Sequence, residues 1–227
     1  SGQKRLSASK ILMIGAGGLG TAALPYLAAA GVGTIGVVDG DIIGLSNLQR
    51  QVIYKNDEVG TLKVKSVEAF LLGLNPNIKV FIYPEMISDK NANILRDYDL
   101  VLDGTDNIES RYLINSLCIK SQKPLITAAI SQWDGQISIF DPKNGTPCYE
   151  CVFPKSESQR VGRDCASEGV FGPLAGILGV MMASETIKYI IKAGKALANE
   201  MIIYEILWGE LKRFQLKARS TCTVCKK

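Results

Sequence analysis

The sequence predicts an α/β fold built on a doubly wound, mostly parallel sheet that is extended by antiparallel strands. Short apolar runs alternate with longer helical segments, a glycine-rich turn follows the first run, and the pattern changes near residue 130. A length of 227 residues suits one such domain. We therefore expect a single domain over 1–227, with a parallel part at 1–130 and an antiparallel part at 131–227.

The elements of the first part follow from apolar runs and from residues that break them. Strands are expected at Lys10–Ile14, Thr34–Asp39, Lys79–Tyr83, Asp99–Asp103 and Leu125–Ala129. Helices are expected at Gly18–Ala30, Lys63–Leu74 and Asn107–Ser121. Strands that alternate with helices in this way form a parallel sheet.

The second part has a different pattern. Gln136–Asp141 is expected to be a strand, and within it Gln136–Phe140 alternates polar and apolar residues, as a half-exposed antiparallel strand does. Met201–Leu207 and Lys212–Leu216 are expected to form a closing pair. Gly169–Ser184 carries no charge and falls short of the roughly 20 apolar residues of a membrane span, so it predicts a buried helix, at a subunit contact. Pro154–Arg163 is polar and aperiodic and predicts a mobile loop.

Composition excludes several classes of function. The net charge is +4 and no basic stripe with interleaved aromatic residues occurs, so we expect no binding to nucleic acid, and we expect no membrane span. The sequence has no histidine, which excludes histidine-based triads, metal ligands and acid–base catalysis. Six cysteines, four of them in close pairs, favour thiolates in a reducing cytoplasm.

A glycine-rich turn after the first strand indicates nucleotide binding. It runs from Gly15 through Gly17 and Gly18 to Gly20 and opens a helix, the context of the Rossmann-like phosphate turn. Asp39 ends the next strand, where a ribose-binding acid belongs. The alternative is a turn that serves packing only, and the motif does not separate NAD from ATP.

Two cations follow the second strand. Arg50 lies in the polar segment after Asp39, and Lys63 opens the next helix. Cations that converge on phosphates favour phosphoryl or nucleotidyl transfer over hydride transfer, whereas surface charges on a loop are the alternative. Asp106 follows the fourth strand, where it could hold Mg²⁺ against phosphates or cap the helix that begins at Asn107.

Two Cys-x-x-Cys pairs predict a structural zinc site. The ligands would be Cys148, Cys151, Cys222 and Cys225, and four thiolates leave no open position for catalysis. A redox dithiol or unmetallated cysteines are the alternatives. Of the two remaining cysteines, Cys118 is expected in the core. Cys165 follows two arginines, which favour a thiolate, so it is a candidate reactive thiol or a bystander.

The glycine turn, Ser46–Gln51, Lys63, Thr105–Asn107, Gly135-Gln136 and both cysteine pairs resemble the MoeB/ThiF family, in order and over essentially the whole chain. The resemblance implies an adenylyltransferase that uses MgATP to activate the C-terminal glycine of a small ubiquitin-like sulfur carrier of the ThiS/MoaD type, which ends in Gly-Gly. It also implies a homodimer and a sulfur donor protein. The pathway is not named by the sequence, since thiamine, molybdopterin, thiolated tRNA and cysteine synthesis all use such carriers.

The resemblance assigns roles by position. The implied ATP site comprises Gly15, Gly17, Gly18, Gly20, Asp39, Asp41, Ser46, Asn47, Leu48, Gln49, Arg50, Lys63, Asp106 and Asn107. The implied catalytic residues are Arg50, Lys63, Asp106 as the magnesium ligand, and Cys165, which falls where ThiF-like members link covalently to the carrier. Arg111 and Asn115 would support the site from the following helix.

One feature of the family has no match in the sequence. Members usually begin with a segment, roughly Arg-Tyr-x-Arg-Gln, whose arginine reaches the partner subunit's ATP, whereas this chain begins Ser1-Gly2-Gln3. Two rival functions are kept at this point, the first because of this missing segment and the second because of the glycine turn and Asp39. One is a zinc-stabilised scaffold that binds the carrier without activating it. The other is an NAD-dependent oxidoreductase, which would leave Arg50 and the cysteine pairs unexplained.

Overall fold

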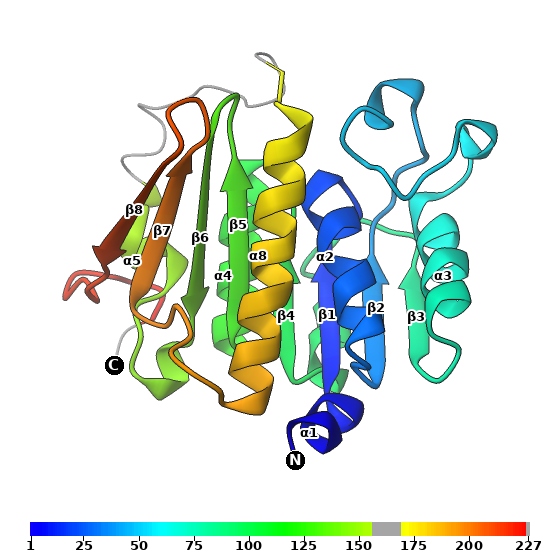
Figure 1. Ribbon diagram of the computed structural model, residues 1–227. Helices are drawn as coiled ribbons and strands as arrows, with labels where there is room; N and C mark the ends of the chain where they lie inside the picture. Colours follow the sequence, from blue (N-terminus) through cyan, green and yellow to red (C-terminus); the bar gives the residue numbers. More distant parts are fainter. Residues whose placement is uncertain (156–168, 226–227) are drawn as a thin grey trace.

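The computed structural model describes residues 1–155 and 169–225, which form an eight-stranded sheet flanked by helices (Figure 1). The strands are β1 Lys10–Ile14, β2 Thr34–Val38, β3 Lys79–Tyr83, β4 Leu100–Asp103, β5 Leu125–Ile130, β6 Asp134–Phe140, β7 Glu200–Glu205 and β8 Glu210–Gln215. The α-helices are α1 Gly2–Ala8, α2 Gly18–Ala29, α3 Lys63–Leu74, α4 Ile108–Lys120, α5 Tyr149–Val152 and α8 Gly172–Ile191. Short 3₁₀ helices occupy Leu45–Asn47, Asn56–Glu58, Ala92–Asp97 and Pro142–Asn144. The loop predicted at Pro154–Arg163 lies almost entirely outside the described residues.

The sheet has the strand order β3-β2-β1-β4-β5-β6-β7-β8. Strands β3, β2, β1, β4 and β5 run parallel, as the sequence predicts. The order reverses between β1 and β4, so the loops after these two strands diverge and leave a crevice at the carboxyl edge of the sheet. The change to antiparallel pairing falls between β5 and β6.

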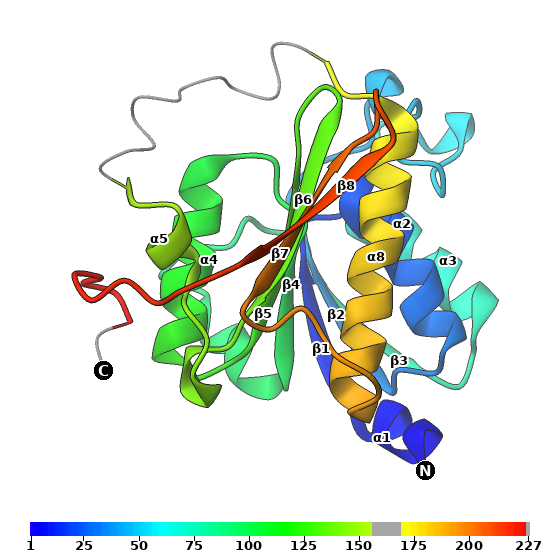
Figure 2. The same ribbon diagram turned by 60° about the vertical axis from the view of Figure 1, so that its left-hand side comes forward.

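Helices cover both faces of the sheet. Figure 2 shows α2, α3 and α8 on one face and α4 with α5 on the other. Strand β1 is buried on both faces: Ile11 and Met13 belong to the core under α2 and α8, and Leu12 and Ile14 to the core under α4. This explains why its sequence is continuously apolar rather than alternating.

Strand β6 is antiparallel to β5 and β7, as expected, but the prediction that it is half exposed is wrong. Ile137 and Ile139 are buried in the core beneath α8, whereas Phe140 is buried in the opposite core, where its ring meets Tyr149 edge-on at 5.9 Å. The polar Ser138 is buried as well, because its hydroxyl donates to the carbonyl of Glu200 at 2.8 Å. A polar residue can be buried when its hydrogen bond is satisfied, and for this reason the polar Ser138 wrongly suggested an exposed position in the sequence.

The apolar helix α8 is longer than predicted. It begins at Gly172 rather than Gly169 and continues to Ile191, so its 20 residues are long and apolar enough to cross a membrane by length and composition alone. Half of its most apolar stretch is buried inside the fold, where α8 packs on α2, β5 and β6. Within the described part of the chain, α8 is thus the central helix of one face of the sheet.

Close packing of α8 on α2 depends on Gly179. A Cβ atom at this position would lie 2.5 Å from the carbonyl oxygen of Leu19 and 2.6 Å from the Cβ of Ala22. Gly176 lies on the same helix, but a Cβ there would have no neighbouring atom within 4 Å. A side chain at Gly179 would therefore clash with α2, whereas a side chain at Gly176 would enter open space.

We expect Gly179→Ala to push the two helices apart and to lower the free energy of unfolding by about 1–3 kcal/mol in urea denaturation. Gly176→Ala should instead raise stability by about 0.5–1 kcal/mol, because alanine loses less conformational freedom on folding than glycine does. Equal effects of the two substitutions would contradict the close contact.

Candidate functional site

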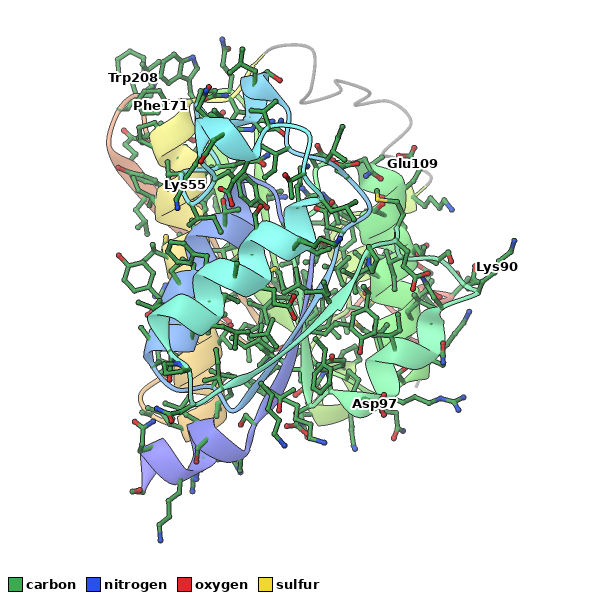
Figure 3. All side chains as sticks on the ribbon, turned by 90° about the vertical axis from the view of Figure 1, so that its right-hand side faces the viewer. Lys55, Lys90, Asp97, Glu109, Phe171 and Trp208 are labelled. Atoms are coloured by element: carbon green, nitrogen blue, oxygen red, sulfur yellow. The ribbon has the colours of Figure 1, made fainter. Side chains whose placement is uncertain are left out.

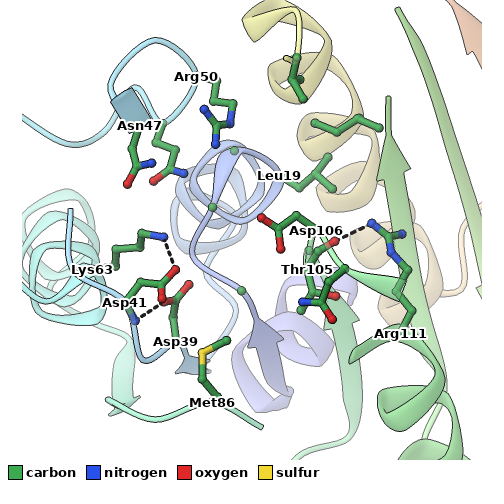
Figure 4. Close-up of a pocket in the computed structure, with 18 residues that line it drawn as sticks. Leu19, Asp39, Asp41, Asn47, Arg50, Lys63, Met86, Thr105, Asp106 and Arg111 are labelled. Atoms are coloured by element: carbon green, nitrogen blue, oxygen red, sulfur yellow. Dashed lines mark hydrogen bonds and ion pairs between the residues drawn. The ribbon is translucent and has the colours of Figure 1, made fainter. Parts of the chain in front are cut away.

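The candidate site is a cavity of about 270 Å³ at the carboxyl edge of the parallel strands. In Figure 3, Glu109 in the first turn of α4 and Phe171, the N-cap of α8, lie toward this end of the molecule, and Asp97 lies toward the other. The cavity is lined by Gly15, Gly17, Gly18, Leu19, Asp39, Asp41, Asn47, Arg50, Gln51, Lys63, Met86, Gly104, Thr105, Asp106, Asn107, Arg111, Ile130 and Val170 (Figure 4). It therefore occupies the switch point between β1 and β4.

The glycine turn between β1 and α2 is held on both sides. The amide of Ala16 donates to Oδ2 of Asp39 at 2.7 Å, and its carbonyl accepts from the hydroxyl of Tyr54 at 2.7 Å. Gly15 has φ of +95°, and a Cβ at Gly20 would lie 2.1 Å from the Gly15 carbonyl oxygen, so both positions require glycine. The turn thereby presents the N-terminus of a 12-residue helix to the cavity.

Asp39 lies at the floor of the cavity beside this turn. Its Oδ1 accepts from the amide of Asp41 at 2.8 Å, while Oδ2 holds Ala16. Burial raises the pKa of Asp39, and the positive charge of Lys63 with the two backbone hydrogen bonds opposes that shift. Both oxygens are therefore occupied by the main chain, which fixes the carboxylate in one orientation.

Lys63 is a buried cation at an unusual place. It is the first residue of α3, where the helix dipole disfavours a positive charge. Its Nζ lies 2.8 Å from Oδ2 of Asp41, whose side chain is 59% exposed. The partner carboxylate can thus turn toward water and leave the ammonium to an anion in the cavity.

The second wall of the cavity is the turn after β4. Asp103 is fully buried and accepts hydrogen bonds from the amide and hydroxyl of Thr105, at 2.9 and 2.6 Å, and from the hydroxyl of Thr127 at 3.1 Å. Asn107 caps α4, because its Oδ1 accepts from the amide of Ser110 at 2.8 Å. The interpretation of Asp106 as the helix cap is therefore wrong. Its carboxylate is exposed and lines the cavity.

Arg111 closes the cavity on the side of β5. This buried guanidinium donates to the carbonyl of Ala128 at 3.0 Å and to that of Thr105 at 2.5 Å, so it supports the Asp106 turn as expected. Asn115, one turn further, does not support the cavity. Its Oδ1 accepts instead from the amide of Tyr149 at 3.0 Å, which ties α4 to α5.

The cavity gathers most of the residues assigned from sequence. Ten line it: Gly15, Gly17, Gly18, Asp39, Asp41, Asn47, Arg50, Lys63, Asp106 and Asn107. Four others do not: Gly20, Ser46, Leu48 and Gln49. Gly20 packs on the turn, the Ser46 carbonyl accepts from the Arg50 guanidinium at 3.4 Å, Leu48 packs against the core, and the Gln49 carbonyl abuts the start of α8.

Sequence reasoning missed several lining residues, including Gln51, Met86 and Ile130. Ile130 is the last residue of β5 and Met86 lies in the loop that follows β3, so the parallel topology alone could have suggested both. Cys165, the candidate reactive thiol, lies outside the described residues. Cys118 is 2% exposed, as expected for a core cysteine.

The two Cys-x-x-Cys pairs meet in a second site at the far end of α4. The sulfurs of Cys148, Cys151, Cys222 and Cys225 all lie within 4.8 Å of one another. Four of the separations are 3.4, 3.6, 3.7 and 3.8 Å, close to the ~3.8 Å edge of a tetrahedron with ~2.3 Å zinc–sulfur bonds. Burial raises the thiol pKa of Cys222, but amides of Cys225 and Val224 outweigh it and lower that pKa to about 7. The donor set fits a tetrathiolate metal site.

The strand order and the cavity at the switch point define a Rossmann-like α/β protein with antiparallel closing strands and a four-cysteine cluster. A model of the ThiF family matches residues 1–224. The chain belongs to the ThiF family, which confirms the resemblance found in the sequence.

Similar proteins extend this assignment. A sulfur carrier protein adenylyltransferase from Thermus thermophilus is 41% identical over 229 residues, covering 99% of this chain and 84% of that protein. The adenylyltransferase and sulfurtransferase MOCS3 of Arabidopsis thaliana is 40% identical over 226 residues, covering 99% of this chain but 48% of its own length. The crystal structure of E. coli MccB with MccA-N7isoASN covers 100% of this chain and 69% of its own, with a TM-score of 0.86 at 24% identity, which shows a shared fold.

Proposed function

We propose that this chain is an adenylyltransferase that uses ATP to activate the C-terminal glycine carboxylate of a small ubiquitin-like sulfur-carrier protein. One observation carries the proposal: the cavity joins a helix N-terminus at Gly17–Gly18 with two cations, Arg50 and Lys63, and an exposed carboxylate, Asp106. The names of the Thermus and Arabidopsis relatives support the reaction class and, for the former, the carrier.

The chemistry needs no general base. The attacking group is a carboxylate that is already ionised at neutral pH, which suits a chain without histidine. Its oxygen forms a bond to the α-phosphorus of ATP, the bond from that phosphorus to the bridging oxygen breaks, and pyrophosphate leaves with the electron pair. The obstacle is repulsion between anions, and the positive charges of Arg50 and Lys63 with the dipole of α2 offset it.

Asp106 is the residue that we propose to hold magnesium. Its carboxylate is exposed in the cavity and has no ion-pair partner among the described residues, and Mg²⁺ prefers one or two carboxylates together with phosphates and water. When bound, magnesium supplies positive charge that offsets the charge of the phosphates. The rigid turn of Asp103 and Thr105 fixes the backbone that presents Asp106.

The Asp106 variant tests this proposal. We expect Asp106→Asn to lower carrier-dependent ATP–pyrophosphate exchange by about 100-fold or more, because the site loses its magnesium ligand. Thermal stability should be unchanged, since the side chain is exposed and unpaired in the described structure.

Glu109 provides the matched control. It is an exposed acid in the first turn of α4 that does not line the cavity, so Glu109→Gln should retain the exchange rate. Exchange at the wild-type rate in Asp106→Asn would refute the magnesium role. No exchange by the wild-type protein with its carrier would refute the adenylyltransferase itself and favour a carrier-binding scaffold.

We also propose that the four-cysteine cluster holds structural zinc. The site would fix the C-terminal segment that carries Cys222 and Cys225 to α5, which carries Cys151. We expect Cys151→Ser to reduce bound zinc, measured by elemental analysis, and to lower the melting temperature by several degrees.

Cys118 serves as the control for the metal site because it lies near the cluster but outside it. Cys118→Ala removes a buried core sulfur, so its melting temperature should fall while one zinc per chain is retained. Full zinc content in Cys151→Ser would refute a site of four thiolates.

Cys165 is proposed to act after adenylation, by forming the covalent link to the carrier that the family resemblance implies. We expect Cys165→Ala to retain pyrophosphate exchange and to lose the later sulfur transfer, measured as thiocarboxylate on the carrier by mass spectrometry. Loss of exchange in this variant would contradict a role confined to the second step. The homodimer and the sulfur donor protein likewise rest on the family resemblance.

A further inference from the structure

A second polar side chain lies beside the glycine turn. Gln51 lines the cavity and is only 2% exposed. Its Nε2 lies 3.8 Å from the position that a Cβ would take at Gly17, the N-cap residue of α2. The carboxamide is thus buried against the helix N-terminus, where the backbone offers free N–H groups.

The side-chain amide of Gln51 contributes little to the stability of the fold. Its Oε1 has no hydrogen-bond partner within the described part of the chain, and a buried polar atom without a partner costs about 1–3 kcal/mol. The main chain of Gln51 is held independently, since its amide donates to Asn47 at 3.0 Å and its carbonyl accepts from Tyr54 at 3.1 Å. An apolar side chain of the same shape would therefore serve the fold at least as well.

We propose that Gln51 binds the nucleotide, by donating a hydrogen bond from Nε2 to a phosphate oxygen at the Gly17–Gly18 turn. This inference rests on the proposed ATP site and adds a neutral donor to the cations Arg50 and Lys63. An amide can present either end by rotating about its last bond, and an anion at the helix N-terminus selects the NH₂ end. The burial of the side chain strengthens the bond, because water does not compete there.

The test compares Gln51→Met with wild type by isothermal titration calorimetry, with ATP, AMP and adenosine as ligands. Methionine keeps the shape and removes the donor. We expect affinity for ATP and AMP to fall at least about 10-fold, as for a hydrogen bond to a charged group, and affinity for adenosine to stay the same. The midpoint of urea unfolding should be unchanged or higher, because the unpaired oxygen is gone.

Two further variants sharpen the result. Gln51→Glu places a negative charge beside the phosphates and should weaken ATP binding more than methionine does. Gln132→Met changes an exposed glutamine outside the cavity and should bind ATP as wild type does.

Wild-type affinity of Gln51→Met for ATP would overturn the inference, as would equal losses for ATP and adenosine. Failure of the wild-type protein to bind ATP would instead overturn the proposed function. A drop in unfolding midpoint with unchanged nucleotide affinity would assign Gln51 a purely structural role and would also refute the inference.

Discussion

The carboxylate of Asp39 holds together the two loops on which the cavity depends. One oxygen accepts from Ala16 in the glycine turn and the other from Asp41 in the loop after β2. The bond to Ala16 spans the gap between the ends of the neighbouring strands β1 and β2, the bond to Asp41 fixes the loop after β2, and the burial of Asp39 makes both difficult to exchange for water. The placement of the α2 N-terminus, and of the loop that leads to Arg50, follows from this buried acid.

Charge in the cavity is balanced rather than uniformly positive. Three basic residues, Arg50, Lys63 and Arg111, line it together with three acidic ones, Asp39, Asp41 and Asp106. Lys63 is paired with an exposed partner, whereas Arg111 is held by neutral carbonyls. The nearby carboxylate of Asp41 keeps the buried ammonium of Lys63 paired.

Sequence patterns predicted the parallel half of the fold well. Lys10–Ile14, Lys63–Leu74 and Lys79–Tyr83 coincide with β1, α3 and β3, because each is a local pattern bounded by a glycine, a proline or a charge. The errors have tertiary causes. Ser138 is polar but buried in β6, since its partner is a distant carbonyl, and α8 extends into charged residues that only packing explains.

The sequence could predict those residues of the candidate site whose position follows from the strand order alone. Residues that end parallel strands converge on one edge, so Asp39 and Asp106 could be placed from sequence. Gln51 could not be singled out, because only the burial of its unpaired oxygen distinguishes it from the exposed Gln49 two residues earlier. The structure places ten of the assigned residues around the cavity, whereas their contacts with ATP remain a prediction.

Helix α4 has contacts that link the two sites of the molecule. Near its start, the guanidinium of Arg111 donates a hydrogen bond to the carbonyl of Thr105. One turn later, the side-chain oxygen of Asn115 accepts a hydrogen bond from the amide of Tyr149, the residue next to Cys148. Helix α4 thus connects the four-cysteine cluster with the turn that bears Asp106. One helix therefore contacts both the turn that bears Asp106 and the segment that carries Cys148 and Cys151, so the two sites share a single rigid element.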